Sequence, residues 1–113
     1  MTEPVMSPHE LRRLQQRYRH LQAEVAQLGW IVQGSLMPKT PRAWRLTRKV
    51  QGKTITLALS AAQAEAFRQA IANHRRLEDL LHEMRHLSEI ALLGSAPGVK
   101  KRPRPNPPKP PLT

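Results

Sequence analysis

The chain has 113 residues, a length that suits one small domain. It contains no cysteine, which excludes disulfides and thiolate metal sites. Its formal net charge of +11 favours an anionic partner.

The positive charge is concentrated in two parts of the chain. Residues 31–59 carry six basic side chains and no acidic one, and residues 94–113 carry five basic side chains and no acidic one. The segments 1–30 and 60–93 are close to neutral. Such clustering is typical of a surface that binds a polyanion. The alternative is a basic surface that only keeps the protein in solution.

The first thirty residues contain no long uncharged apolar segment, so the sequence predicts neither a signal peptide nor a membrane span. The absence of cysteine fits a reducing compartment. We therefore expect a cytoplasmic protein that does not bind membranes.

Residues 7–28 are predicted to form the first helix. Ser7 and Glu10 have the spacing of a capping box, and Gly29 follows at the expected end. Apolar residues recur at alternating intervals of three and four, as in a coiled-coil heptad. This seam either packs against a second helix, which we favour because three heptads are few for a coiled coil, or forms a homodimer. It consists of Leu11, Leu14, Tyr18, Leu21, Val25 and Leu28.

Residues 30–37 are apolar apart from a Gly-Ser interruption and predict a short strand. Part of this segment, residues 31–37, is a candidate third strand beside the hairpin described next. Residues 38–41 contain two prolines and are expected to form a loop, because proline is not expected inside a sheet.

Residues 44–59 predict a β-hairpin around which the domain is organised. Gln51 and Gly52 suit a two-residue turn, since glycine accepts the positive φ that such turns need. The register then pairs Val50 with Lys53, and the period of two separates an apolar face from a polar and basic one. A lone hairpin is marginal in water, so we expect the flanking helices to cover the apolar face. That face holds Trp44, Leu46, Val50, Ile55, Leu57 and Leu59, with Arg48 near the tip.

A second capping box, Ser60 with Gln63, predicts a long helix to about Leu93, with Gly94 past its end. The fold class is therefore α+β. It has a long N-terminal helix, a small antiparallel sheet and a long C-terminal helix packed antiparallel on the first. The apolar face of the second helix holds Ala70, Leu77, Leu80, Leu81, Met84, Leu87 and Ala91, flanked by Phe67 and His74.

The composition changes at residue 95. Seven of the eleven prolines lie between Pro97 and Pro111 among basic residues, which predicts a disordered, partly polyproline-II tail. The tail is a candidate for phosphate contacts, for recognition by a proline-binding domain, or for no role. We divide the chain into a flexible N-terminus (1–6), one domain (7–94) and this tail (95–113).

The string His82-Glu83-Met84-Arg85-His86 has the HExxH pattern of zinc hydrolases. We reject a zinc site because both histidines lie opposite the apolar stripe and no third ligand follows. Residues 52–54 read Gly-Lys-Thr, but the upstream glycine of a phosphate-binding loop is missing and a hairpin turn is the wrong context. We expect no enzymatic activity, no metal and no cofactor.

About sixty residues resemble a family of small uncharacterised prokaryotic proteins that are often encoded near transposases and other mobile-element genes. Many relatives have a cysteine cluster suited to a metal between the Gly-Ser-Leu strand and the hairpin. Residues 37–43 of this chain offer no such ligand. The resemblance implies genomic company and raises the expectation of a nucleic-acid partner, without implying a mechanism. It rests on Gly34-Ser35-Leu36, Trp44-x-x-Thr47-Arg48-Lys49-Val50-x-Gly52-Lys53-Thr54, Leu59-Ser60-x-x-Gln63, Ala70-Ile71-x-Asn73-x-Arg75-x-Leu77 and Leu87-Ser88.

The sequence favours a non-enzymatic accessory protein that binds the phosphate backbone of DNA or RNA with weak sequence preference. The alternative is a helical module for homo-oligomerisation or protein interaction that does not bind nucleic acid. The predicted contact residues are Lys39, Arg42, Arg45, Arg48, Lys49 and Lys53 in the hairpin region and Lys100, Lys101, Arg102 and Arg104 in the tail.

Overall fold

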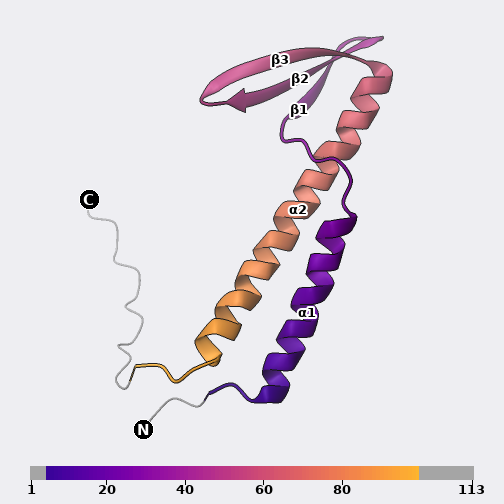
Figure 1. Ribbon diagram of the computed structural model, residues 1–113. Coiled ribbons are helices and arrows are strands. Elements are labelled where there is room, and N and C mark those ends of the chain that lie inside the picture. Colours follow the sequence, from indigo (N-terminus) through magenta and orange to yellow (C-terminus); the bar gives the residue numbers. More distant parts are fainter. Residues whose placement is uncertain (1–4, 100–113) are drawn as a thin grey trace, which may run out of the picture.

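The computed structural model describes residues 5–99 and has an α+β fold. Two long helices lie side by side, and a three-stranded antiparallel sheet lies at one end of the longer helix (Figure 1). The elements in chain order are α1 (Pro8–Gln27), β1 (Ser35–Thr40), β2 (Ala43–Val50), β3 (Lys53–Ser60) and α2 (Ala61–Gly94).

Both helices begin at the serine caps that the sequence predicts. The Ser60 hydroxyl accepts a hydrogen bond from Gln63 N at 3.1 Å, and the Gln63 side chain accepts one from Ser60 N at 3.0 Å, which completes a capping box. At α1, Ser7 Oγ accepts from Glu10 N at 3.1 Å. The predicted glycine end of α1 is wrong, because the helix is closed by Leu28 in an extended conformation.

The two helices pack antiparallel, as predicted. Arg17 Nε donates to Glu83 at 2.6 Å, and one α1 heptad later Glu24 accepts from Arg76. At the far end, Met6 N donates to the carbonyl oxygen of Gly94 at 2.9 Å. In each pair the two residue numbers add to about one hundred. A residue of α1 therefore lies beside the residue of α2 whose number is about one hundred minus its own.

The hairpin has the predicted register. Val50 lies opposite Lys53, Arg48 opposite Ile55 and Trp44 opposite Leu59. The turn residues Gln51 and Gly52 have φ of 50° and 82°, the pair of positive values that suits a tight hairpin with the normal strand twist.

The third strand differs from the prediction. It runs over Ser35–Thr40 rather than beginning near residue 31, and it includes Pro38, which was expected in a loop. Because β1 is an edge strand, a missing backbone N–H there costs no hydrogen bond if it points away from β2. The register shifts between Pro38 and Thr40, and residues 41–42 form the turn to β2.

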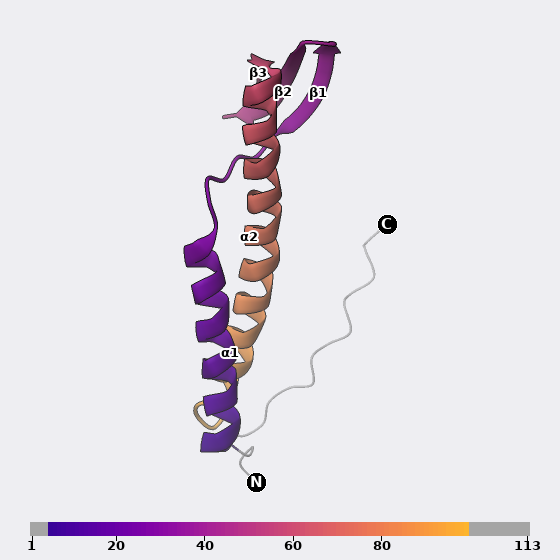
Figure 2. The same ribbon diagram turned by 90° about the vertical axis from the view of Figure 1, so that its right-hand side faces the viewer.

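Of the two described helices, α2 alone covers the sheet, whereas both flanking helices were expected to do so. Helix α1 lies beside the C-terminal part of α2 and does not reach the strands (Figures 1 and 2). The buried contacts at the base of the sheet include Leu46 at 0%, Leu59 at 7% and Ala64 at 0% exposed. Towards the β2–β3 turn the apolar face opens, and Val50 is 40% exposed.

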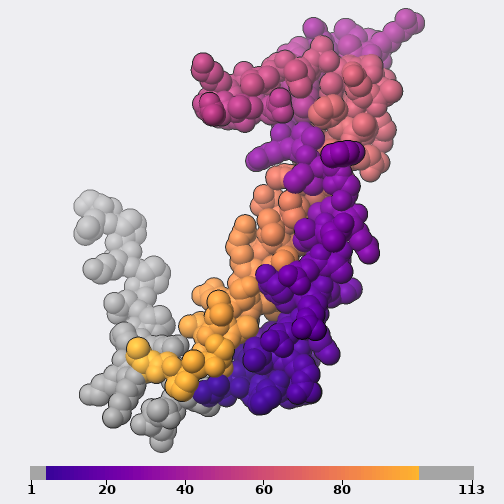
Figure 3. Space-filling view, in the orientation of Figure 1, coloured from indigo at the N-terminus to yellow at the C-terminus, as the bar shows by residue number. Residues whose placement is uncertain are grey.

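The segment between α1 and β1 lies across α2 and joins the two halves of the molecule (Figure 3). Val32 N donates to the carbonyl oxygen of Ala70 at 3.1 Å, and Asn73 Nδ2 donates to the carbonyl oxygen of Trp30 at 2.9 Å. These bonds hold the entry to the sheet against the middle of α2.

Candidate nucleic-acid interface

The six basic residues predicted in the hairpin region are all exposed. None of them forms an ion pair with another residue of the described chain. Residues 31–59 contain no carboxylate, so nothing within the sheet compensates their charge. They are Lys39, Arg42, Arg45, Arg48, Lys49 and Lys53.

The strand register divides these cations between the two faces of the sheet. Arg45 and Lys49 lie on the face turned away from α2, since Leu46 between them is completely buried on the α2 side. The side chains opposite them, Ala58 and Thr54, are small and exposed. On β1, Met37 lies opposite Arg45 on the same open face and is 58% exposed, so it is the one large apolar neighbour of the two cations among the paired strand residues.

Arg48 and Lys53 lie on the other face, beyond the part of the hairpin that α2 covers. Their neighbours Val50 and Leu57 are 40% and 37% exposed. The hairpin end projects from the body (Figure 1). The strand register places cations on both of its faces.

Lys39 and Arg42 lie at the opposite end of β2, around the turn between β1 and β2. The turn is held by a hydrogen bond from Arg42 N to the Thr40 hydroxyl at 3.3 Å. An eight-residue strand is about 26 Å long, so the six cations are distributed over roughly that length. Such a length matches a run of phosphates rather than one anionic group.

The cations between the two helices have different surroundings. Arg17 donates two hydrogen bonds to the Glu83 carboxylate, at 2.6 and 2.9 Å, and Arg76 pairs with Glu24. These hydrogen bonds lower the pKa of Glu83 and of Glu24 and raise the pKa of Arg17. Two arginines are thus paired with carboxylates across the helices, whereas none of the six cations of the hairpin region is paired within the described chain.

The two tryptophans do not form a stacking platform on the open face. Trp44 lies on the α2 side, where the Arg68 guanidinium is 5.1 Å from its ring centroid. Trp30 is 89% exposed but belongs to the segment before β1. The sequence did not indicate how far Trp30 projects, because its apolar neighbours suggested a strand.

The HExxH segment has no metal-site geometry in the part of the chain that the structure describes. His82 and His86 are exposed, and Glu83 is held by Arg17. No group of three potential ligands occurs among residues 5–99. The four predicted tail cations lie outside the described residues, as does most of the proposed tail.

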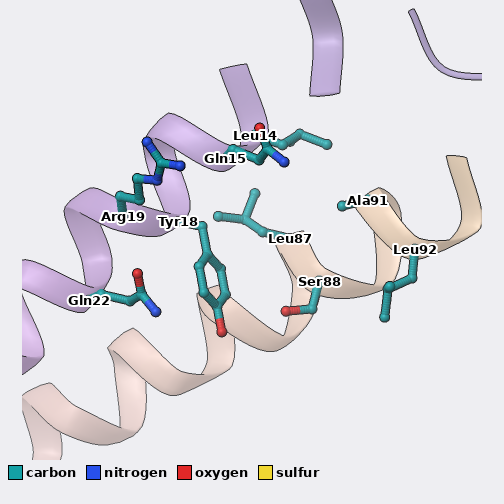
Figure 4. Close-up of a pocket in the computed structure, with 9 residues that line it drawn as sticks. All are labelled: Leu14, Gln15, Tyr18, Arg19, Gln22, Leu87, Ser88, Ala91 and Leu92. Carbon is teal, nitrogen blue, oxygen red and sulfur yellow. The ribbon is translucent and has the colours of Figure 1, made fainter. Parts of the chain in front are cut away.

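A groove of about 360 Å³ lies between the helices at the end far from the sheet (Figure 4). Leu14 and Tyr18 line it from α1, and Leu87, Ala91 and Leu92 from α2. The predicted heptad seam of α1 borders it, and each of the six seam residues is buried or half-buried within the single chain. The sequence contained a signal for this groove, since the apolar stripe of α2 is broader than one helix partner needs.

No protein-family model, no curated protein and no solved structure matches the chain. No helix within residues 5–99 combines the length and the apolar character that crossing a bilayer requires.

Proposed function

We propose that the protein is a non-enzymatic accessory protein that binds the phosphate backbone of nucleic acid through the basic sheet. The proposal rests on one observation: six exposed cations lie on a sheet that contains no carboxylate, whereas the helical segments contain nearly equal numbers of acidic and basic residues. We place the protein in the cytoplasm, and its resemblance to proteins encoded near mobile elements agrees with such a role.

The shape of the hairpin supports this proposal. A two-stranded ribbon fits the major groove of B-DNA, which is about 12 Å wide. Cations on both faces near the β2–β3 turn suit contact with the phosphates on either side of a groove, and Arg45 and Lys49 add contacts along one strand. Apart from the two cations, the open face holds small side chains and Met37, none of which offers a bidentate contact to a base, so sequence preference is weak.

The test is fluorescence anisotropy with labelled duplex DNA, single-stranded DNA and RNA across a salt series. The double variant Arg45→Ala/Lys49→Ala removes two phosphate contacts and is expected to reduce the slope of log K against log salt by about 1.8 on duplex DNA. The matched control, Arg13→Ala/Arg85→Ala, removes the same charge from exposed positions on the helices. It leaves the slope nearly unchanged.

Equal effects of the two double variants would show that net charge alone drives binding and would remove the sheet from the contact. A third variant replaces Lys100, Lys101, Arg102 and Arg104 by alanine in the full chain. If this variant abolishes binding, the tail is the nucleic-acid arm and the proposal for the sheet fails.

The groove between the helices favours a second candidate, a helical interaction module that does not bind nucleic acid. The same titration separates the two. Absence of binding to all three nucleic acids at moderate salt would reject the first candidate and leave the second.

A further inference from the structure

The two sides of the helix pair differ in chemistry. On one side, which we call the ion-pair side, Arg17 reaches Glu83 across the helices. Glu24 and Arg76 follow one heptad further along, and so lie on the same side. The opposite side, the groove side, contains the groove of Figure 4 and has no ion pair between the helices within the described chain.

Helix α2 has an apolar surface on the groove side that α1 does not cover. Leu80 faces α1 and is 1% exposed, whereas Leu81 points 100° away from it and stays half-buried. Residues spaced by seven from Leu81 continue its row, with Ser88 in the groove and His74 and Phe67 towards the sheet. Leu81 and Phe67 are the apolar members of this row, and apolar residues at heptad spacing are what a helical partner packs against.

The exposure of apolar groups is largest at both ends of this side. Leu92, which lines the groove, is 74% exposed. At the sheet end, Trp30 and Ile31 are 89% and 47% exposed and border a second hollow that Phe67 lines. The two hollows lie at the two ends of this side, and we call the surface that joins them, with Leu81 between, the apolar strip.

The charges that border the strip are opposite on its two edges. On α1, Arg19 lines the groove and Arg12 lies one heptad, or two turns, earlier, while the acids of that helix, Glu10 and Glu24, are on the ion-pair side. On α2, Glu78 and Glu89 each precede an apolar residue of the strip by three positions, and Arg85 lies between them on the same edge. Two carboxylates and one cation therefore occupy this edge, and its net charge is negative.

This arrangement complements itself. A twofold axis parallel to the helices places each α1 over the α2 of a second copy, with the arginine edge over the glutamate edge. Residues of α1 and α2 whose numbers add to about one hundred lie at the same height along the helix pair. In the dimer, Arg12 therefore lies beside the partner's Glu89, and Arg19 lies within one turn of the partner's Glu78. An axis perpendicular to the helices would instead place the arginine edges together.

The available area suits a stable dimer. A strip about 35 Å long and two helix diameters wide offers about 700 Å² per copy, close to the roughly 800 Å² that each partner buries in a standard interface. A four-helix arrangement also completes the packing of two helices whose contacts leave Tyr18 and Leu81 half-buried.

We propose that the groove side binds a second copy of the chain. The twofold axis of this dimer is parallel to the helices, so the dimer has a four-helix core and both sheets at the same end. This interface uses the side of the helix pair, and each chain keeps its own α1–α2 packing. This dimer does not require nucleic-acid binding.

The test is sedimentation equilibrium of the full chain over a concentration series. Native protein is expected to dimerise at micromolar concentration, and Leu92→Glu to raise the dimer Kd by about 100-fold, because each dimer buries the new charge twice. The control Leu93→Glu changes an adjacent residue that is 56% exposed and does not line the groove, and is expected to leave Kd within about threefold. Far-UV circular dichroism checks that the helices remain.

A charge swap tests the orientation. Arg12→Glu and Glu89→Arg each place like charges together and are expected to raise Kd by about tenfold, and the double variant to restore it. A native protein that stays monomeric at about 200 μM would overturn the dimer, since the interface would then be too weak to function. Equal weakening by Leu92→Glu and Leu93→Glu would place any dimer interface elsewhere. Failure of the double variant to recover would reject the proposed axis.

Discussion

Two glycines near the sheet are required for different physical reasons. Gly52 has φ of +82°, and a Cβ there would meet no atom within 4 Å. Gly34 has ordinary backbone angles, but a Cβ there would lie 3.0 Å from the Thr47 carbonyl oxygen and from Leu46 Cδ1. The first position is limited by backbone conformation and the second by space.

We predict that Gly52→Ala lowers the free energy of unfolding by about 1 kcal/mol, because an L-residue with a Cβ disfavours the left-handed region. Gly52→Asn is expected to cost less, since asparagine tolerates that region. Urea unfolding followed by circular dichroism measures both. An alanine variant as stable as the native protein would show that the turn has another conformation in solution.

At the level of elements, the cross-helix ion pairs make the association of α1 with α2 depend on pH. The Arg17 hydrogen bonds hold the pKa of Glu83 below its ordinary value of 4.5, and Arg76 does the same for Glu24. A carboxylate whose pKa is lower in the folded state stabilises the fold above its unfolded pKa. That stabilisation is lost as pH falls through the folded pKa.

Thermal unfolding from pH 7 to pH 3 is therefore expected to show a falling Tm below about pH 4.5, with a smaller fall in Glu83→Gln. Asp79→Asn is the control, because it removes a carboxylate that is exposed and forms no ion pair within residues 5–99. If Glu83→Gln and native protein lose Tm in parallel, the Arg17 contact contributes nothing to the pH dependence.

Local chemistry made some elements predictable from sequence and left others undetermined. Gln51 and Gly52 set the hairpin register because positive φ at a two-residue turn leaves one pairing, and the cap at Ser60 set the start of α2. Pro38 was placed outside the sheet because the sequence does not say which strand lies at an edge.

The candidate site was likewise predictable from the sequence only in part. The six cations of the hairpin region were evident from the absence of acid in residues 31–59. Their division between two faces followed from the register. The pairing of Arg17 with Glu83 depends on how two distant helices align, and no local pattern encodes that alignment. The groove side was not predicted, because the apolar residues of α2 were assigned to a single face that packs on α1.

At the level of the whole molecule, α2 is the one element within residues 5–99 that contacts both the sheet and the other helix. The sheet packs on its N-terminal part and α1 on its C-terminal part, so neither contacts the other. The buried side chains lie where α2 meets these partners, and include Leu21, Leu46 and Leu80. The β2–β3 end extends beyond this core.

This distribution predicts uneven protection against hydrogen exchange. Amides near Leu46 and Leu59 are expected to exchange more slowly than those near Val50 and Ile55, because α2 covers only the base of the hairpin. Native-state exchange followed by NMR measures the difference. Uniform protection along the hairpin would mean that something else, such as a second copy, covers its end.

Because one continuous helix carries both halves, the direction of the sheet is set by helical phase. Helix α2 has 34 residues and is about 51 Å long, with no proline inside it. Each residue inserted between the part of α2 that contacts the sheet and the part that contacts α1 would rotate the sheet by about 100° around the helix axis relative to α1. The number of residues in α2 therefore fixes the direction in which the sheet points around the helix axis. Adding one residue would aim the basic hairpin in a new direction, and adding seven would return it to within about 20° of its original bearing, displaced by about 10 Å.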